Sequence, residues 1–299
     1  AYLMKISCFR IKMEIVKAGA IPPLVELMRS ADATLRESAT VVILTLSATD
    51  ANKLVIGGSG VTPLLVDMLI YGSVQGKVDA VMALYNLSTH SENLDLILAS
   101  GAISPLIWLL KECKKASKVA EKTTGILQSL TVFEDARSEI VAEGGGVLAL
   151  VEVLEEGSIQ GREHAVSALL AMCQCQSGRC KYRDAILQEG AIPGLLELTV
   201  QGTAGAKQKA QKLLKLLRSP PTASTSRSAS ASASASASAM LKSIVYDMTS
   251  HVDDGQSTAK KMLSEMVQLS MGQSMRHLHQ TAMVSVSSRS NRFTDVPTK

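Results

Sequence analysis

Aromatic residues are scarce in this chain and make up 3% of its 299 residues, with a single Trp. Nucleic-acid surfaces that stack bases need such rings, so their scarcity argues against nucleic acid as a partner. The net charge of +4 is also too small to force that function. Leu, Ile, Val and Ala must therefore supply most of the hydrophobic 46% of the residues, and such a core suits packed helices.

Catalytic signatures are also missing. The five His residues are scattered, and the sequence has no HExxH, no GxSxG and no phosphate-binding glycine loop. The glycines at 144–146 follow an expected helix rather than a strand, so they indicate a turn between helices. We therefore expect no catalytic residue and no cofactor within this chain.

The cysteines are odd in number and scattered through expected helices. This usage fits a reducing compartment, so we expect the protein in the cytoplasm, the nucleus or both. Cys173, Cys175 and Cys180 could be three metal ligands, but their spacing lacks two CxxC pairs and no His lies close by. We favour the alternative in which Cys173 closes a buried helix and the other two cysteines flank a loop. No metal is therefore expected.

Long apolar runs are absent too. No run reaches the roughly 18 residues that a membrane-spanning helix needs, and no secretory signal is present. We therefore expect no integral membrane segment. The first residue is Ala1, and the sequence joins a repeat partway through. This start suggests a fragment that lacks an N-terminal part.

One phrase recurs five times: Gly, a hydrophobic pair, often Pro, then Leu-Leu or a similar pair. Its glycines recur every 41 to 45 residues, at Gly19, Gly60, Gly101, Gly145 and Gly190. A helical repeat of this length is typical of an armadillo or HEAT solenoid. Such arrays hold other molecules on extended surfaces. The repeat therefore predicts a binding protein.

Each phrase is expected to open a helix. Its Gly ends the previous helix in the left-handed conformation, and Pro in the first turn costs little because its missing N–H would be unpaired anyway. About twenty residues later comes a second apolar block, which in the second unit runs from Ala80 to Ser88. Its small Ala80 and Ala83, with Leu84 and Leu87, should let a long helix lie deep against its neighbours.

The phrases and the block Ala-x-x-Ala-Leu-x-Asn-Leu-Ser resemble armadillo repeats. This resemblance implies an all-α, right-handed superhelical solenoid over residues 1–218. It would contain five units from about residue 11, preceded by the cut-off third helix of another unit. The third helices of such arrays line a concave groove.

A narrower resemblance rests on the segments 171–190 and 193–202 and on the tail 253–278. These are similar to the C-terminal half of plant U-box/armadillo proteins, a family of E3 ubiquitin ligases. In that family the U-box recruits the ubiquitin-loaded E2 enzyme, and the armadillo array holds a substrate or regulator. We see no U-box in this chain, so any contact with an E2 is expected only through a U-box outside it.

The resemblance also predicts the groove. Asn86 stands where armadillo proteins place an asparagine that bonds the backbone of an extended peptide, and its counterparts are Thr45, Ser129 and Ala171. Importin-type arrays place Trp four residues earlier, where this chain has Met82. We predict that the partner-binding groove contains Ser38, Val41, Thr45, Asp79, Met82, Asn86, Lys122, Ser129 and His164.

Two basic stretches stand out. One comprises Lys111, Lys114, Lys115, Lys118 and Lys122, and the other comprises Lys209, Lys212, Lys215 and Arg218. A solvated outer face is the simplest interpretation. A docking site for acidic peptides is the next alternative, followed by nucleic acid or anionic lipid.

The composition changes after Arg218. Residues 219–256 begin with a Ser/Ala-rich low-complexity stretch that predicts a flexible linker, with a phosphorylation site as an alternative. Residues 257–283 repeat apolar side chains at helical spacing, which predicts an amphipathic helix that folds back on the array or docks on another protein. Residues 284–299 are expected to be a disordered tail.

The leading functional hypothesis is a protein-interaction scaffold that serves as the substrate- or regulator-binding half of a U-box E3 ligase. The second is that the intact gene product is itself an active E3 ubiquitin transferase. The third is an adaptor of the catenin or importin kind, unconnected with ubiquitin. The missing Trp and Asn ladder weakens the import version, and the plant-like tail weakens both.

Overall fold

The computed structural model describes residues 2–174 and 181–218, with side chains from residue 9 onward. Every element in these ranges is helical and none is a strand, as predicted for residues 11–218. The elements are α1 (Tyr2–Lys17), α2 (Ile21–Met28), α3 (Ala33–Ser47), α4 (Asp50–Ile56), η1 (Gly57–Val61), α5 (Thr62–Tyr71), α6 (Val74–Ser88), η2 (Ser91–Asn93), α7 (Leu94–Ala99), α8 (Ile103–Glu112), α9 (Lys118–Leu130), α10 (Glu134–Ala142), α11 (Gly146–Glu156), α12 (Ile159–Cys173), α13 (Arg183–Gln188), α14 (Ala191–Gln201) and α15 (Ala204–Arg218).

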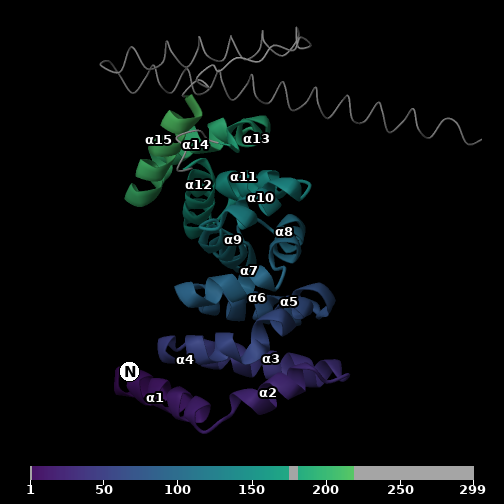
Figure 1. Cartoon of the computed structure of the whole chain (residues 1–299). Coiled ribbons are helices and arrows are strands. Elements are labelled where there is room, and N and C mark those ends of the chain that lie inside the picture. Colours follow the sequence, from purple (N-terminus) through teal and green to yellow (C-terminus); the bar gives the residue numbers. More distant parts are fainter. Residues whose placement is uncertain (1, 175–180, 219–299) are drawn as a thin grey trace, which may run out of the picture. The chain divides into compact units, whose positions relative to one another are not determined.

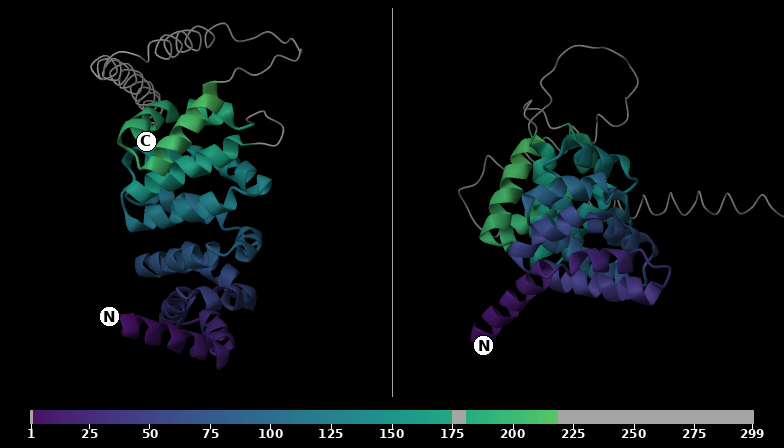
Figure 2. Two further views of the ribbon diagram at one scale, coloured as in Figure 1. Left: turned by 90° about the vertical axis from the view of Figure 1, so that its left-hand side faces the viewer. Right: turned by 60° about the horizontal axis from the view of Figure 1, so that its bottom comes forward.

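The helices group into five repeat units, each with a first, a second and a long third helix. The units are α1–α3, α4–α6, α7–α9, α10–α12 and α13–α15. The third helices α3, α6, α9, α12 and α15 pack on one another in that order. Figure 1 shows the units layered from α1 to α15, and the turned views of Figure 2 show the same layers. Residues of successive units, far apart in sequence, are thus brought together across the layers.

The glycines of the repeated phrase all adopt the left-handed conformation. Their φ angles are +86° at Gly19, +81° at Gly60, +68° at Gly101, +83° at Gly145 and +76° at Gly190. A side chain is strained in this region, so only Gly turns the chain here without cost. The predicted role of these glycines is confirmed.

The third helices also share a side-chain N-cap at their first turns. The side chains of Asp32, Ser73, Ser117, Ser158 and Thr203 each accept a hydrogen bond from a backbone N–H two or three residues later. Three of these capping residues also bond a carboxylate of the preceding third helix. Ser73 N–H donates to Glu37, Ser158 Oγ donates to Glu121, and Thr203 Oγ1 donates to Glu163.

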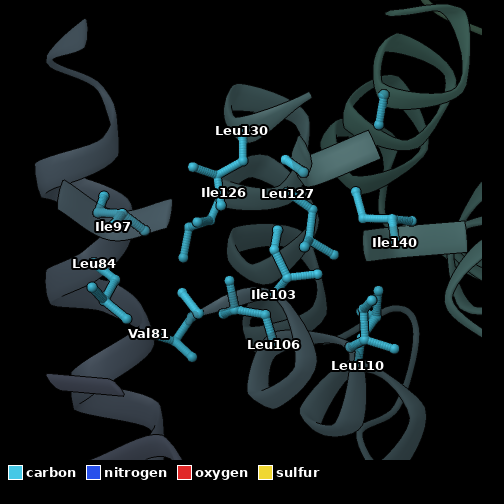
Figure 3. Close-up of a cluster of buried hydrophobic side chains, with 14 of the residues drawn as sticks. Val81, Leu84, Ile97, Ile103, Leu106, Leu110, Ile126, Leu127, Leu130 and Ile140 are labelled. Carbon is cyan, nitrogen blue, oxygen red and sulfur yellow. The ribbon is translucent and has the colours of Figure 1, made fainter. Parts of the chain in front are cut away.

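The core is a continuous band of aliphatic side chains between the layers. Ala80, Ala83, Leu84 and Leu87 are fully buried, as predicted for the long helix of the second unit. Figure 3 shows Val81 and Leu84 of α6 facing Ile97 and Ile103, with Leu127 and Ile140 beyond them. Burying one such aliphatic side chain contributes roughly 1.5–3 kcal/mol, so stability is spread over the stack.

Buried asparagines join the first three units. Asn52 Nδ2 donates to the carbonyls of Lys12 and Leu46, at 3.2 and 3.1 Å. Asn93 Nδ2 donates to those of Lys53 and Leu87, both at 3.1 Å. Each amide therefore bonds both the first and the third helix of the unit that precedes its own.

Three sequence expectations concern the helix before residue 11, membrane-spanning segments and residues 219–299. Within the described residues, no separate third helix stands before residue 11 as expected, because α1 runs unbroken from Tyr2 to Lys17 in a segment free of Gly and Pro. The stretch Asp50–Tyr71 is long and apolar enough to span a membrane, but 44% of its apolar window is buried in the repeat core and Gly60 breaks it, so it is weak support for a span. The linker, amphipathic helix and tail predicted over 219–299 lie outside the described residues.

Candidate functional site

The nine predicted groove residues all lie on third helices, namely α3, α6, α9 and α12. None of them is buried. Ser38, Val41 and Thr45 on α3 are exposed, and the other six are half-buried. We call the surface formed by these nine side chains the third-helix face. Their assignment to partner binding stays a prediction, but each is accessible from outside the core.

The centre of the third-helix face is an aromatic and basic cluster. Lys122 Nζ of α9 lies 3.8 Å from the centre of the Tyr85 ring of α6, which is a cation–π contact. The His164 ring of α12 meets the same Tyr85 ring edge-on, with 6.4 Å between ring centres. A tyrosine, a lysine and a histidine from three successive units thus form one group.

Gly125 on α9 makes this meeting possible. A Cβ at that position would lie 2.7 Å from Tyr85 Cε2 and 3.4 Å from His164 Nε2. The first distance is shorter than real carbon contacts allow, so any side chain would push the Tyr85 ring away. Gly125 therefore clears the space between α6 and α12.

Glu121 supplies the negative charge beneath this cluster. Its carboxylate is almost completely buried and lies 2.6 Å from Lys118 Nζ and 3.5 Å from Lys122 Nζ, while Ser158 Oγ donates to it at 2.9 Å. Burial alone would raise the pKa of Glu121. The hydrogen bonds from Lys118 and Ser158 and the two lysine charges outweigh it, so the pKa is lowered and the carboxylate stays ionised.

His164 is held neutral by its surroundings. Its Nδ1 lies 2.6 Å from Gln128 Oε1, and because that oxygen can only accept, Nδ1 carries the proton. Burial is the main cause that lowers the pKa of His164, and the charge of Lys122 adds to it. Nε2 is then the ring nitrogen that can accept a hydrogen bond.

Asn86 is only partly available. Its Nδ2 donates to Ser47 Oγ at 3.2 Å and, more weakly, to the Leu44 carbonyl at 3.4 Å, both at the end of α3. We expected an open ladder amide on the basis of its position. The amide nitrogen instead links α6 to α3, and Oδ1 is the atom left to accept a hydrogen bond from a partner's backbone.

Two surface hollows lie away from the third-helix face, along the second helices. One of about 470 Å³ is lined by Met28, Leu64 and Tyr71 among others, and one of about 360 Å³ by Ile70, Pro105 and Trp108. Trp108 is 51% exposed, and Lys77 Nζ lies 4.7 Å from its ring centre. Core packing thus uses only part of this ring.

The described residues contain no group of three or more side chains suited to hold a metal ion. Cys173 is buried, whereas Cys175 and Cys180 lie outside the described residues. The third-helix face, with the Tyr85 ring beside it, can offer hydrogen-bond donors and acceptors and the ammonium group of Lys122 in a cation–π pair. These groups suit recognition.

Sequence reasoning missed Tyr85, Gln128, Glu121 and Glu163 as parts of this surface. Tyr85 could have been found from its place three residues after Met82, because positions three apart lie on the same side of a helix. The Gln128–His164 and Glu121–Ser158 contacts join residues 36 and 37 apart, so no local pattern signals them.

The stacked three-helix units define an armadillo repeat solenoid. A designed armadillo repeat protein superimposes with a TM-score of 0.59 at 22% identity, covering 69% of this chain and 85% of that protein. Another designed armadillo repeat protein, solved in complex with the peptide (KR)4, gives a TM-score of 0.56 at 22% identity, over 69% of this chain and 85% of the other. Both similarities show the fold.

Sequence comparison shows to which family of armadillo repeat proteins the chain belongs. Residues 6–237 match the family described as the plant U-box protein ARM repeat region, and the chain belongs to this family. U-box domain-containing protein 45 of Arabidopsis thaliana is 34% identical over 206 residues, which is 69% of this chain and 26% of that protein. U-box domain-containing protein 17 of the same plant is 30% identical over 255 residues, 70% of this chain and 34% of that protein. The chain thus spans about a quarter to a third of the length of these relatives.

Proposed function

We propose that this chain binds a protein substrate or regulator on its third-helix face, as the recognition half of a U-box E3 ubiquitin ligase. The armadillo repeats form a protein-interaction scaffold, and the relatives are U-box domain-containing proteins. The observation that carries the proposal is the placement of all nine predicted side chains outside the core of four stacked third helices. A surface built from consecutive layers suits an extended partner segment.

The type of partner has support from the fold. One armadillo repeat protein of similar structure was solved with the peptide (KR)4. His164 Nε2 and Asn86 Oδ1 offer this chain hydrogen-bond acceptors for a peptide. Contact with an E2 enzyme only through a U-box outside this chain, no nucleic acid as a partner and no integral membrane segment within this chain are further parts of the proposal.

Site-specific cross-linking tests the face. A photo-reactive amino acid at Met82 should capture a protein partner from plant extract, whereas the same group at Val200 on α14, which is 64% exposed, should not. The captured protein is then purified, and its affinity is measured against the unmodified chain. Equal capture from both positions, or none at Met82, contradicts the proposal.

A second candidate is that the intact gene product is an active E3 ubiquitin transferase. The U-box domains named in its relatives favour it. With E1, E2, ubiquitin and ATP, we expect this 299-residue chain alone to form no ubiquitin chains, and a version joined to a family U-box to form them. Robust ubiquitin-chain formation by the 299 residues alone would contradict the proposal that this activity needs the U-box.

We also propose that the protein works in the cytoplasm, the nucleus or both. Its five cysteines, odd in number and scattered along the sequence, suit a reducing compartment. A fluorescent fusion of the intact protein, imaged in plant cells, tests this: label confined to the secretory pathway would contradict it. An adaptor role unconnected with ubiquitin is favoured if the fusion's partners are never ubiquitylated.

A further inference from the structure

Charge is distributed unevenly along the third helices. Two sets of corresponding positions run through the five units. They are Ser38, Asp79, Lys122, His164 and Lys209, and Val41, Met82, Gly125, Ser167 and Lys212. The first two units contribute no cation to either set, whereas the last three contribute three lysines beside the neutral His164. One half of the surface is therefore neutral to acidic, and the other half is basic.

Nearby carboxylates do not cancel the lysines of the basic half. Glu121 is shared between Lys118 and Lys122, and its side chain is only 6% exposed. Because one buried carboxylate faces two ammonium groups, the surface above it keeps a net positive charge. Lys122 also lies over the Tyr85 ring, which orients its ammonium without neutralising it.

The last unit adds to this charge. Lys209 Nζ lies 3.0 Å from Glu163 Oε1, so this pair is balanced. Lys212, one turn further along α15, is exposed and has no acidic partner within the described residues. Helix α15 carries five basic residues and no acidic one. Lys118, Lys122, Lys209 and Lys212 together place four ammonium groups against two carboxylates.

We propose that α9, α12 and α15 bind an acidic segment of the partner protein, whose carboxylates lie over Lys122 and Lys212. This inference rests on the proposed function and names the chemistry of its ligand. Complementary charge speeds association and selects among partners even where each exposed ion pair adds little affinity. A protein segment is favoured over nucleic acid because Tyr85, the aromatic ring in this cluster, is already covered by Lys122 and His164.

The neutral half limits the length of this acidic segment. Val41, Met82 and Thr45 offer an apolar and hydroxyl surface, and Asp79 would repel a carboxylate. The acidic part should therefore end at the second unit, where apolar side chains of the partner take over. The partner segment is expected to be acidic at one end and apolar at the other.

Fluorescence anisotropy tests the charge preference on the full chain. The probes are labelled peptides of alternating Gly with Glu, Gln or Lys, and of equal length. At low salt the Glu peptide should bind best, and a Lys122→Gln, Lys212→Gln double variant should weaken it by about two- to twentyfold. Added salt should reduce this difference because it screens exposed charges. Thermal unfolding of the variant shows whether the fold is kept.

A matched control separates local from general charge. The double variant Lys17→Gln, Lys111→Gln also removes two charges, from α1 and α8, and should bind the Glu peptide as the unmodified chain does. Equal weakening by both double variants, or equal affinity for the Glu and Gln peptides, overturns the proposal. Efficient displacement of the Glu peptide by a single-stranded oligonucleotide of equal charge would overturn it in favour of nucleic acid.

Cross-linking at Met82 and the affinity of the captured partner distinguish failure of this inference from failure of the proposed function. If Met82 cross-links a partner whose affinity is unchanged by the Lys122 and Lys212 substitutions at low salt, the acidic segment is wrong and the scaffold stands. If no partner cross-links at Met82, the proposed function fails whatever the peptides do. A partner that cross-links and loses affinity in the lysine variant supports both.

Discussion

The side-chain amide of Asn93 fills the space that a Cβ on Gly57 would need. The two residues belong to neighbouring first-helix segments, and Asn93 also donates to the Lys53 and Leu87 carbonyls. One amide thus satisfies two backbone acceptors and packs directly against the backbone of the unit before it.

Gly57→Ala should destabilise the protein. The added methyl overlaps Asn93, and overpacking of this kind costs about 1–3 kcal/mol. Urea unfolding measures the loss. Gly58→Ala is the control, because a Cβ there meets nothing within 4 Å. If both variants unfold at the same urea concentration, the close contact has no energetic weight.

Asn93→Ala should cost about 1–3 kcal/mol, because it removes the two buried hydrogen bonds that Nδ2 donates to the Lys53 and Leu87 carbonyls. The same urea titration reports it. The substitution also removes the amide atoms that would clash with a methyl group on residue 57, so Gly57→Ala should be less harmful in the Asn93→Ala background. A double-mutant cycle with purely additive effects would argue against the contact.

Gly125→Ala should fail to stabilise α9 although Ala favours a helix by about 1 kcal/mol over Gly. Displacement of the Tyr85 ring, 2.7 Å from the new carbon, offsets the gain. In a Tyr85→Ala background the same change should become stabilising. Calorimetric melting of the four proteins tests this, and a gain in both backgrounds would show that the ring moves freely.

His164 should make stability depend on pH. Its folded pKa lies below its unfolded value of about 6.5 because of burial and Lys122, with Glu121, Glu163 and Lys209 also facing it. A depressed pKa contributes stability above the unfolded pKa that is lost as pH falls through and below it. The unfolding free energy should therefore fall more between about pH 7.5 and 5.5 in the unmodified chain than in His164→Gln. Identical falls would mean that the histidine is not desolvated.

Asn86→Ala should weaken partner binding about two- to tenfold, which is the effect of losing one hydrogen bond worth roughly 0.5–1.5 kcal/mol. Isothermal titration with the purified partner, identified by the cross-linking, measures this loss of affinity. Because Asn86 also bonds Ser47, a small loss of stability is expected. A large loss of stability with unchanged affinity would make Asn86 a structural residue.

The sequence predicted those features that repeat. The phrase glycines, the buried small residues Ala80 and Ala83, and the accessible positions of the nine groove residues all follow from one period applied five times. Features that occur once or twice were missed. Asn93 differs from a surface Asn only by its three-dimensional neighbours, and Tyr85 meets His164 only because Gly125 lies between them.

Exceptions to the period were the hardest to predict. Trp108 stands where the repeats otherwise carry an acidic residue, so the pattern gave no guide to its exposure. Helix α1 is the first element described, so the described residues hold no earlier unit to compare it with. In both places the missing information is the packing of neighbouring layers, which a single sequence does not contain.

The carboxylates that bond the helix caps give the array a direction. Glu37, Glu121 and Glu163 each precede, by 36 to 40 residues, the capping residue that they bond. A unit that has folded therefore already presents the group that helps to start the third helix of the next. On a ribosome, where the N-terminal units emerge first, each completed layer would act as a template for the following one. Val78 occupies the corresponding place before Ser117. The third helix of the third unit therefore starts without a carboxylate from the second unit.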